Sequence, residues 1–177
     1  MCPRPYYSCR RPNLPGLRCA STALLLSLLL GCNSSKPSQP QSKSSPHAAS
    51  AGRDLSVDEA RGGHTLKKHA GRSDQELRDR LRREHEISAA SSYTDRHAAE
   101  TFIATFLDDN QVRVRQWLGQ DRHPNLALDC LGDPAWPIGR TMRRGQSQSE
   151  PCSNATLVLK WVPPQDYFVL TSYPECR

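Results

Sequence analysis

The sequence Ala155-Thr-Leu-Val-Leu-Lys-Trp-Val162 is rich in β-branched and large apolar residues, which favours a β-strand. It is followed by the turn cluster Pro163-Pro-Gln-Asp166 and then by a second run of the same character, Tyr167-Phe-Val-Leu-Thr-Ser-Tyr173. Two such runs joined by a short turn predict an antiparallel hairpin. Because side chains alternate along a strand, Thr171 and Tyr173 are expected to project from the same face.

A capping box marks the first clear helix upstream of the hairpin. Ser73 can cap the helix, and Glu76 can reach back to it three residues later. Leu77 and Leu81 follow four residues apart, so they lie on one helical face. We therefore predict a helix from Asp74 to about Arg83.

The strongest helical signal follows Thr94, which can act as an N-cap. Apolar residues then recur at helical spacing: Ala98, Ala99, Phe102, Ile103, Phe106, Leu107, Val114, Trp117 and Leu118. This pattern predicts the main core helix, ending at Gly119.

The region after Gly119 has a different character. Prolines 124, 134, 137 and 151 and glycines 132, 139 and 145 interrupt it, which disfavours long helices and suits short strands joined by loops. Helices followed by an antiparallel sheet predict an α+β domain.

The amino-terminal segment resembles the signal of a bacterial lipoprotein. Four arginines precede the apolar run Ala23-Leu-Leu-Leu-Ser-Leu-Leu-Leu30, which has the length of a signal-peptide core rather than of a membrane span. The run ends in Leu29-Leu30-Gly31-Cys32, which resembles a lipobox, with Cys32 as the lipidated residue. The other interpretation is an ordinary secretory signal with a chance cysteine. Asn33, rather than aspartate, follows the cysteine, which favours the outer membrane.

The amino-acid composition divides the rest of the chain into a tether and a folded domain. Residues 32–60 are rich in Ser, Pro, Gln, Ala and Lys without apolar periodicity, which predicts a disordered tether between the signal peptide (1–31) and a folded domain (61–177). The chain has a formal charge of +6, but four of its 24 basic residues precede Cys32. The remaining 20 face 18 acidic residues, so charge alone indicates no partner.

Three cysteines remain in the mature chain besides the anchor, an odd number that permits at most one internal disulfide. Cys130–Cys152 would close a loop over the proline-rich region, and Cys152–Cys176 would join two strands; the spacing does not choose between them. The sequence has no Cys-x-x-Cys pair, so we predict no zinc site and no cofactor.

A polar segment near the start of the domain carries the candidate chemistry. His64 to His69 predicts about two helical turns before Gly71 and contains Lys67 and Lys68. Histidines suit acid and base roles in cleavage of RNA by its own 2′-hydroxyl, and cations stabilise the anionic transition state. Composition alone also permits a different interpretation, in which these side chains are solvent-exposed polar groups on a short helix.

Several segments together resemble the bacterial RNase A-like toxin domain of contact-dependent growth inhibition proteins. They are Gly62-Gly-His-Thr-Leu-Lys-Lys-His-Ala-Gly71, Leu77 with Arg80-Leu81, Ile87-Ser-Ala-Ala-Ser-Ser-Tyr-Thr-Asp-Arg96 and Val169-Leu-Thr-Ser-Tyr-Pro174. The resemblance implies an RNase A-like fold, with helices packed on a curved antiparallel sheet, that cleaves RNA without metal and is neutralised by a cognate immunity protein.

The resemblance also implies roles for individual residues. It identifies His64 or His69 as the acid/base histidine, Arg80 as a cation facing phosphate, and Thr171 with Tyr173 as catalytic or phosphate-positioning groups. Lys67 and Lys68 would be further substrate contacts. The two histidines are not distinguished, because a separation of five residues places them on different sides of an ideal helix.

The setting differs from that of the family, whose toxins usually end a very large delivery protein. Here the domain follows a lipobox and a short tether, so we expect an exported, lipid-anchored protein that is displayed, secreted or delivered to a neighbouring cell. A second hypothesis is a catalytically silent lipoprotein that binds a protein or polyanion with the same fold. A third is a purely structural envelope lipoprotein.

Overall fold

The computed structural model describes residues 52–176. The helices are α1 (Leu55–Ala60), α2 (Thr65–His69), α3 (Asp74–Arg83), α4 (Arg96–Asp109) and α5 (Gln111–Leu118). The strands are β1 (Ala89–Tyr93), β2 (Leu126–Cys130), β3 (Gly139–Arg143), β4 (Glu150–Cys152), β5 (Asn154–Val162) and β6 (Asp166–Glu175). The signal peptide, the lipid anchor Cys32 and most of the tether lie outside this part of the chain. Between residues 52 and 176 no helix has the length and apolarity to cross a bilayer.

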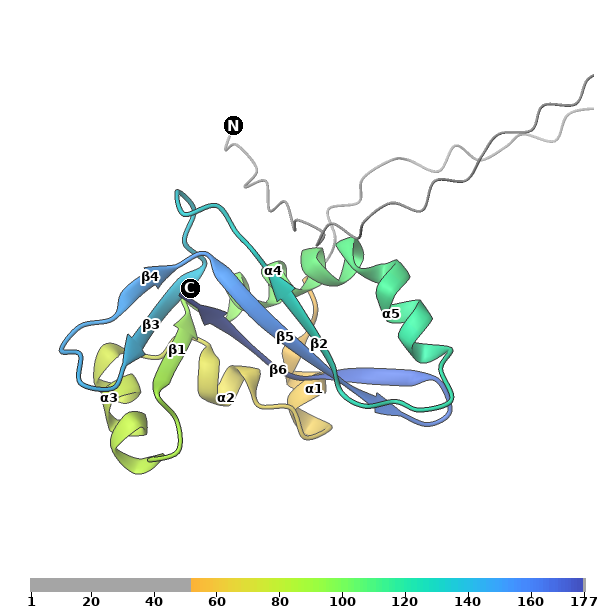
Figure 1. The fold of residues 1–177 in the computed structure, drawn as a ribbon, viewed down its shortest axis with the longest axis horizontal. Helices are drawn as coiled ribbons and strands as arrows, with labels where there is room; N and C mark the ends of the chain where they lie inside the picture. The colour runs from red at the N-terminus through yellow and green to blue at the C-terminus, as the bar shows by residue number, and fades with distance from the viewer. Residues whose placement is uncertain (1–51, 177) are drawn as a thin grey trace, which may run out of the picture. The chain divides into compact units, whose positions relative to one another are not determined.

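The strands form two antiparallel sheets of three, in the orders β1-β3-β4 and β2-β5-β6 (Figure 1). The predicted hairpin is confirmed, because β5 pairs with β6 across the expected turn. A register shift between Val158 and Leu159 leaves Leu170 as a bulge in β6. The α+β prediction is likewise confirmed, although the strands are divided between two sheets.

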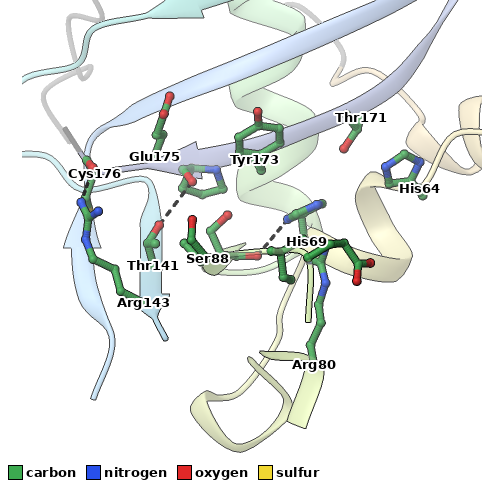
Figure 2. A pocket seen from close by; sticks show the side chains of 15 residues that line it. His64, His69, Arg80, Ser88, Thr141, Arg143, Thr171, Tyr173, Glu175 and Cys176 are labelled. Atoms are coloured by element: carbon green, nitrogen blue, oxygen red, sulfur yellow. Dashed lines mark hydrogen bonds between the residues drawn. The ribbon is translucent and has the colours of Figure 1, made fainter. Parts of the chain in front are cut away.

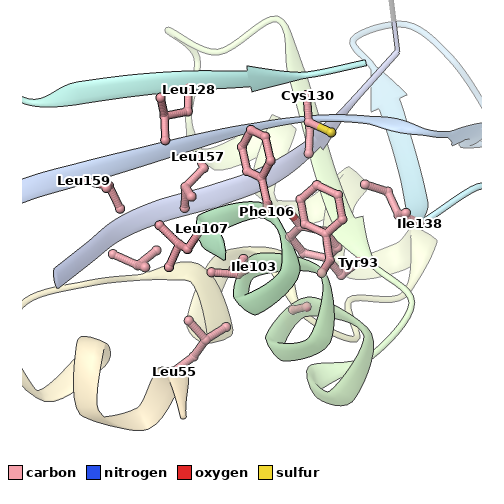
Figure 3. Packing of buried hydrophobic residues seen from close by; sticks show 14 of the residues in the cluster. Leu55, Tyr93, Ile103, Phe106, Leu107, Leu128, Cys130, Ile138, Leu157 and Leu159 are labelled. Carbon is pink, nitrogen blue, oxygen red and sulfur yellow. The ribbon is translucent and has the colours of Figure 1, made fainter. Parts of the chain in front are cut away.

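The main core lies between α4, α5 and the sheet β2-β5-β6 (Figure 3). Ile103 of α4 and Leu128, Leu157 and Leu159 of the sheet are all fully buried in it. A smaller core holds α3 on the other sheet, where Leu77 and Leu81 meet residues of β1 and β3. The predicted capping box of α3 is present, with Ser73 and Glu76 bonded to each other's backbone.

Three boundaries differ from the sequence prediction. The folded part begins before residue 61, since α1 buries Leu55 completely in the main core. Asp95 rather than Thr94 caps α4, because its carboxylate accepts from the backbone of Ala98. The predicted single core helix is two helices, separated at Asn110, whose side-chain amide bonds back to a carbonyl of the preceding turn.

One of the two disulfide pairings left open by the sequence is present. Cys152 of β4 is bonded to Cys176, just beyond β6, with a Cα–Cα distance of 5.0 Å. Cys130 lies instead in the main core with 1% of its surface exposed. The disulfide therefore joins the ends of strands that belong to different sheets.

Candidate active site

A pocket of about 490 Å³ lies where α2 and α3 meet strands β1, β3 and β6 (Figure 2). Its lining includes all five residues predicted to be catalytic: His64, His69, Arg80, Thr171 and Tyr173. The structure therefore brings together side chains that are more than 100 positions apart in the sequence. Lys67 and Lys68 do not belong to the lining.

Helix α2 is held against the outer edge of β6, the last strand of its sheet. The backbone N–H of His64 donates to the carbonyl of Leu170 at 3.0 Å, and Thr65 Oγ1 accepts from the N–H of Ser172 at 2.9 Å. An edge strand has unpaired backbone groups, and these two bonds satisfy part of that edge. They also fix the histidine segment beside the strand that carries Thr171.

Asp58 of α1 adds a third hydrogen bond between this part of the chain and β6. Its buried carboxylate accepts from the N–H of Val169 at 2.8 Å and forms a two-pronged ion pair with Arg53, at 2.7 Å for each contact. A side chain at Gly63 would place Cβ 2.5 Å from the carbonyl oxygen of Val169 and 2.8 Å from that of Asp58. Only glycine permits so close an approach of the α1–α2 connection to β6, so Gly63 sets the position of His64.

His69 is buried, with 6% of its surface exposed, and its Nδ1 lies 3.0 Å from the carbonyl oxygen of Ser91. A carbonyl oxygen only accepts, so Nδ1 carries the proton and Nε2 keeps its lone pair. Burial, reinforced by the nearby charge of Arg80, lowers the pKa of His69 to about 3. The ring is packed against Tyr173, with 5.4 Å between ring centroids, and is a neutral imidazole near pH 7.

His64 lies across the pocket from His69, with 6.4 Å between the ring centroids. It is the N-cap residue of α2, with φ −149°, and so precedes the helix rather than belonging to it. This resolves the difficulty of the five-residue separation, because helical geometry does not govern its side chain. Partial burial, followed by the charge of Lys68, lowers the pKa of His64, and Glu59 opposes that effect.

Arg80 lines the pocket, and its charge acts on both histidines. Its Nε lies 3.1 Å from Glu84 Oε2, and its Nη1 donates to the carbonyl of Lys68 at 3.4 Å. The same carboxylate lies 3.6 Å from the Lys68 ammonium. Glu84 therefore fixes Arg80 in place and also pairs with Lys68, which does not line the pocket.

Thr171 and Tyr173 both face the pocket from β6, as Figure 2 shows. The Thr171 hydroxyl is buried and makes no hydrogen bond within the described part of the chain. A buried polar group without a partner carries a free-energy cost, and at functional sites it is commonly completed by a ligand. Thr171 therefore offers a hydroxyl for a substrate oxygen.

Three contributors to the site were missed by the sequence analysis: the carbonyl of Ser91, the carboxylate of Glu84, and Arg143 in the pocket lining. Glu84 had a readable signal, because it follows Arg80 at the i, i+4 spacing of helical ion pairs. The other two had none, since they depend on how β1 and β3 pack against α2 and β6.

The comparisons with known proteins agree with this geometry. The family model described as "Bacterial CdiA-CT RNAse A domain" matches residues 63–174, which includes every predicted catalytic residue. The chain belongs to the CdiA-CT RNase A domain family. This CdiA-CT RNase A domain is therefore a ribonuclease of the contact-dependent growth inhibition toxins, and the RNase A-like fold expected from the sequence is confirmed.

A solved structure resembles this CdiA-CT RNase A domain. It is a chain of the crystal structure of the CdiA-CT/CdiI complex from Y. kristensenii, with a TM-score of 0.58 and 29% sequence identity. The match covers 64% of this chain and 100% of that chain. No curated protein matches the sequence. In this chain the fold places around one pocket a neutral imidazole, a second histidine, an arginine and a hydroxyl without a partner among the described residues. This set is suited to proton transfer at a phosphodiester.

Proposed function

We propose that this ribonuclease cleaves RNA without a metal ion, by attack of the ribose 2′-hydroxyl on the adjacent phosphorus. The observation that carries the proposal is the state of His69, a neutral imidazole whose Nδ1 proton is held by Ser91 and whose Nε2 lone pair is left for chemistry. Such a group is unprotonated at neutral pH, so its Nε2 lone pair is available to the proton of a bound 2′-hydroxyl.

His69 is the general base in this scheme. Its Nε2 takes the proton of the 2′-hydroxyl as the O2′–P bond forms. The carbonyl of Ser91 holds the ring orientation and stabilises the imidazolium that results, because the retained Nδ1 proton points at a fixed acceptor. A bound phosphate anion beside the ring raises the low pKa of His69, which strengthens it as a base once substrate is present.

His64 is the general acid. Its half-buried ring lies across the pocket from His69, and it gives a proton to the departing O5′ as the P–O5′ bond breaks. The products are a 2′,3′-cyclic phosphate and a free 5′-hydroxyl, with one proton gained by His69 and one lost by His64. The separation of the two rings supports these opposite roles, because the attacking and leaving oxygens lie on opposite sides of the phosphorus.

Arg80 and Thr171 stabilise the charge that develops on the non-bridging oxygens. Arg80 is held in one orientation by Glu84, so little reorganisation is needed when the anion arrives. The hydroxyl of Thr171, which has no hydrogen-bond partner among residues 52–176, gains one from the substrate. Tyr173, packed on His69, positions the imidazole and completes this face. Lys67 and Lys68 lie outside the pocket lining, and we assign them only to contacts with more distant phosphates.

We further propose that the domain is exported and anchored to the envelope through Cys32, as the Leu-Leu-Gly-Cys sequence suggests. Its partners are then RNA and a cognate immunity protein. The second partner is supported by the related toxin, whose crystal structure is a complex with CdiI. An immunity protein would be needed wherever the active domain reaches RNA of the producing cell.

The proposal is tested by incubating the full chain with single-stranded RNA in excess EDTA. We expect cleavage to persist, to leave 2′,3′-cyclic phosphate ends, and to fall by at least about 100-fold in the His69→Gln variant, the lower range for loss of a general base. Thr171→Val should also lose activity while keeping its fold. Metal-dependent cleavage, or products without a cyclic phosphate, would exclude the mechanism. A well-folded chain that cleaves no RNA would favour a silent binding lipoprotein.

A further inference from the structure

We infer that Arg143 forms a second subsite in the pocket, which binds a backbone phosphate of RNA next to the phosphate that is cleaved. This inference rests on the proposed function and adds a specific contact to it. Arg143 was not among the residues singled out by the sequence or by the family resemblance, and no step of the chemistry uses it.

The first observation is the place of Arg143 in the pocket. In Figure 2 it lies at the end of the lining opposite His64, with Thr141 and Tyr173 between them. Strand register fixes this spacing, since Arg143 is opposite Ala89 and Thr141 is opposite Ser91, whose carbonyl anchors His69. Two residues along a strand are about 7 Å, a distance on the scale of one nucleotide.

The second observation is the charge of Arg143. Seven other arginines of the described residues form ion pairs with carboxylates, and Arg80 in the same pocket is one of them. For Arg143, by contrast, no carboxylate between residues 52 and 176 lies within ion-pair distance. Glu86 and Glu175 also line the pocket, but among residues 52–176 Arg143 is the arginine of the lining that forms no ion pair. A polyanionic substrate supplies the missing charge.

The third observation is that the side chain is oriented without being neutralised. Nη2 of Arg143 donates to the carbonyl of Cys176 at 2.8 Å, and its backbone N–H donates to Gln146 Oε1 at 2.9 Å. Cys176 is itself fixed to β4 by the disulfide with Cys152. One neutral acceptor, the carbonyl of Cys176, thus orients the guanidinium and leaves its other N–H groups for phosphate oxygens.

The inference is tested with three RNA substrates: a dinucleoside monophosphate, the same dinucleotide with a 5′-phosphate, and the same dinucleotide with a 3′-phosphate. We expect one added phosphate to raise kcat/KM of the wild-type full chain by about fivefold, as for a partly exposed charge pair. Arg143→Gln, which removes the charge but keeps a polar side chain, should abolish this gain. Arg143→Lys should keep part of it.

Arg115→Ala is the matched control, because it removes an exposed arginine of α5 that does not line the pocket. This variant should keep the full gain from the added phosphate. An equal gain in Arg143→Gln and wild type would overturn the inference, as would a change in base preference with no change in the phosphate gain.

Binding of an uncleavable 2′-deoxy analogue of each substrate, measured by fluorescence anisotropy, separates this inference from the proposed mechanism. Arg143→Gln should lower the slope of log affinity against log salt concentration by about 0.7, the value for one phosphate contact on a single strand. If the chain binds these analogues through Arg143 but cleaves no RNA, the proposed mechanism fails and the subsite stands. If Arg143→Gln changes neither the affinity nor the salt slope, Arg143 does not form a phosphate subsite.

Discussion

The hydroxyl oxygen of Tyr93 lies 2.6 Å from the hydroxyl oxygen of Ser172, and this buried contact joins β1 of one sheet to β6 of the other. Ser172 Oγ also lies 3.1 Å from the carbonyl oxygen of Thr156, to which it donates. The Tyr93 hydroxyl is therefore the donor to Ser172. Because Ser172 is between Thr171 and Tyr173, this chain of hydroxyls fixes the strand that carries both pocket residues.

Tyr93→Phe should destabilise the protein by about 1 kcal/mol, the usual net value of one hydrogen bond. Ser172 keeps its bond to Thr156 in this variant, so no donor is left unsatisfied and the loss stays modest. Urea unfolding measures it. Thr105→Val is the control, since the hydroxyl of Thr105 donates only to the carbonyl of Thr101 in its own helix, and its loss should stay below about 0.5 kcal/mol. Equal losses in the two variants would contradict a special role for the Tyr93 contact.

Gly63→Ala should both destabilise the protein and reduce ribonuclease activity. The new Cβ would lie 2.5 Å from one backbone oxygen and 2.8 Å from another, so α2 must move away from β6, at a cost of about 1–3 kcal/mol. Gly119→Ala tests whether any glycine substitution has this effect, because its Cβ would be 3.7 Å from its nearest neighbours. Gly63→Ala should have a lower melting temperature and cleave RNA more slowly than Gly119→Ala. If it matches Gly119→Ala in both, the α1–α2 connection can shift to make room for the new Cβ without loss of stability or activity.

Reduction of the Cys152–Cys176 disulfide should lower the free energy of unfolding by about 3 kcal/mol, since the bond closes a loop between residues 24 apart. The expected measurement is a lower urea midpoint in the presence of a thiol reductant. A double variant, Cys152→Ser with Cys176→Ser, should show the lowered midpoint without reductant and no further response to it. If the reductant leaves the wild-type urea midpoint unchanged, the disulfide does not add to the free energy of unfolding.

The pH dependence of cleavage should identify the acid. The mechanism requires His64 to be protonated in the free enzyme, and burial lowers its pKa from the ordinary 6.5. We therefore expect kcat/KM to fall as pH rises above this lowered pKa, by up to about tenfold per pH unit. In His64→Gln this alkaline limb should disappear from the remaining activity. Its persistence would assign the acid role to another group.

Much of the fold was readable because local signals agreed with the tertiary structure. The hairpin of β5 and β6 had strand-forming residues on both sides of a turn cluster, and Ser73 with Glu76 formed the capping box they predicted. The pocket residues, in contrast, could be grouped only through resemblance to a family. Composition alone could not separate His64 and His69 from exposed histidines.

Other features depend on packing that spacing does not encode. Helix α1 has one large buried apolar residue, Leu55, so its pattern is too short to distinguish it from the tether. Thr94 and Asp95 are both good N-caps, and only the backbone geometry selects Asp95. The acceptor for His69 is a backbone carbonyl, at Ser91, and any residue type could have supplied it.

Stability against pH provides a test of His69 that is independent of catalysis. In the folded state its pKa is lowered to about 3, whereas in the unfolded chain it is near the ordinary 6.5. Below pH 6.5 the unfolded chain therefore binds a proton that the folded protein excludes, and stability falls as pH falls from about 6.5 toward about 3. At pH 5 this one group should destabilise the protein by about 2 kcal/mol relative to neutral pH.

His69→Gln should remove that part of the pH dependence. Its side-chain amide does not titrate, so the difference between the variant and wild type should change by about 2 kcal/mol from pH 7 to pH 5. His85→Gln, at an exposed position, should follow the wild-type curve. Urea unfolding at both pH values gives the comparison. If the free energy of unfolding changes with pH equally in His69→Gln and wild type, His69 takes up a proton in the folded state. The neutral general base of the proposed mechanism would then be excluded.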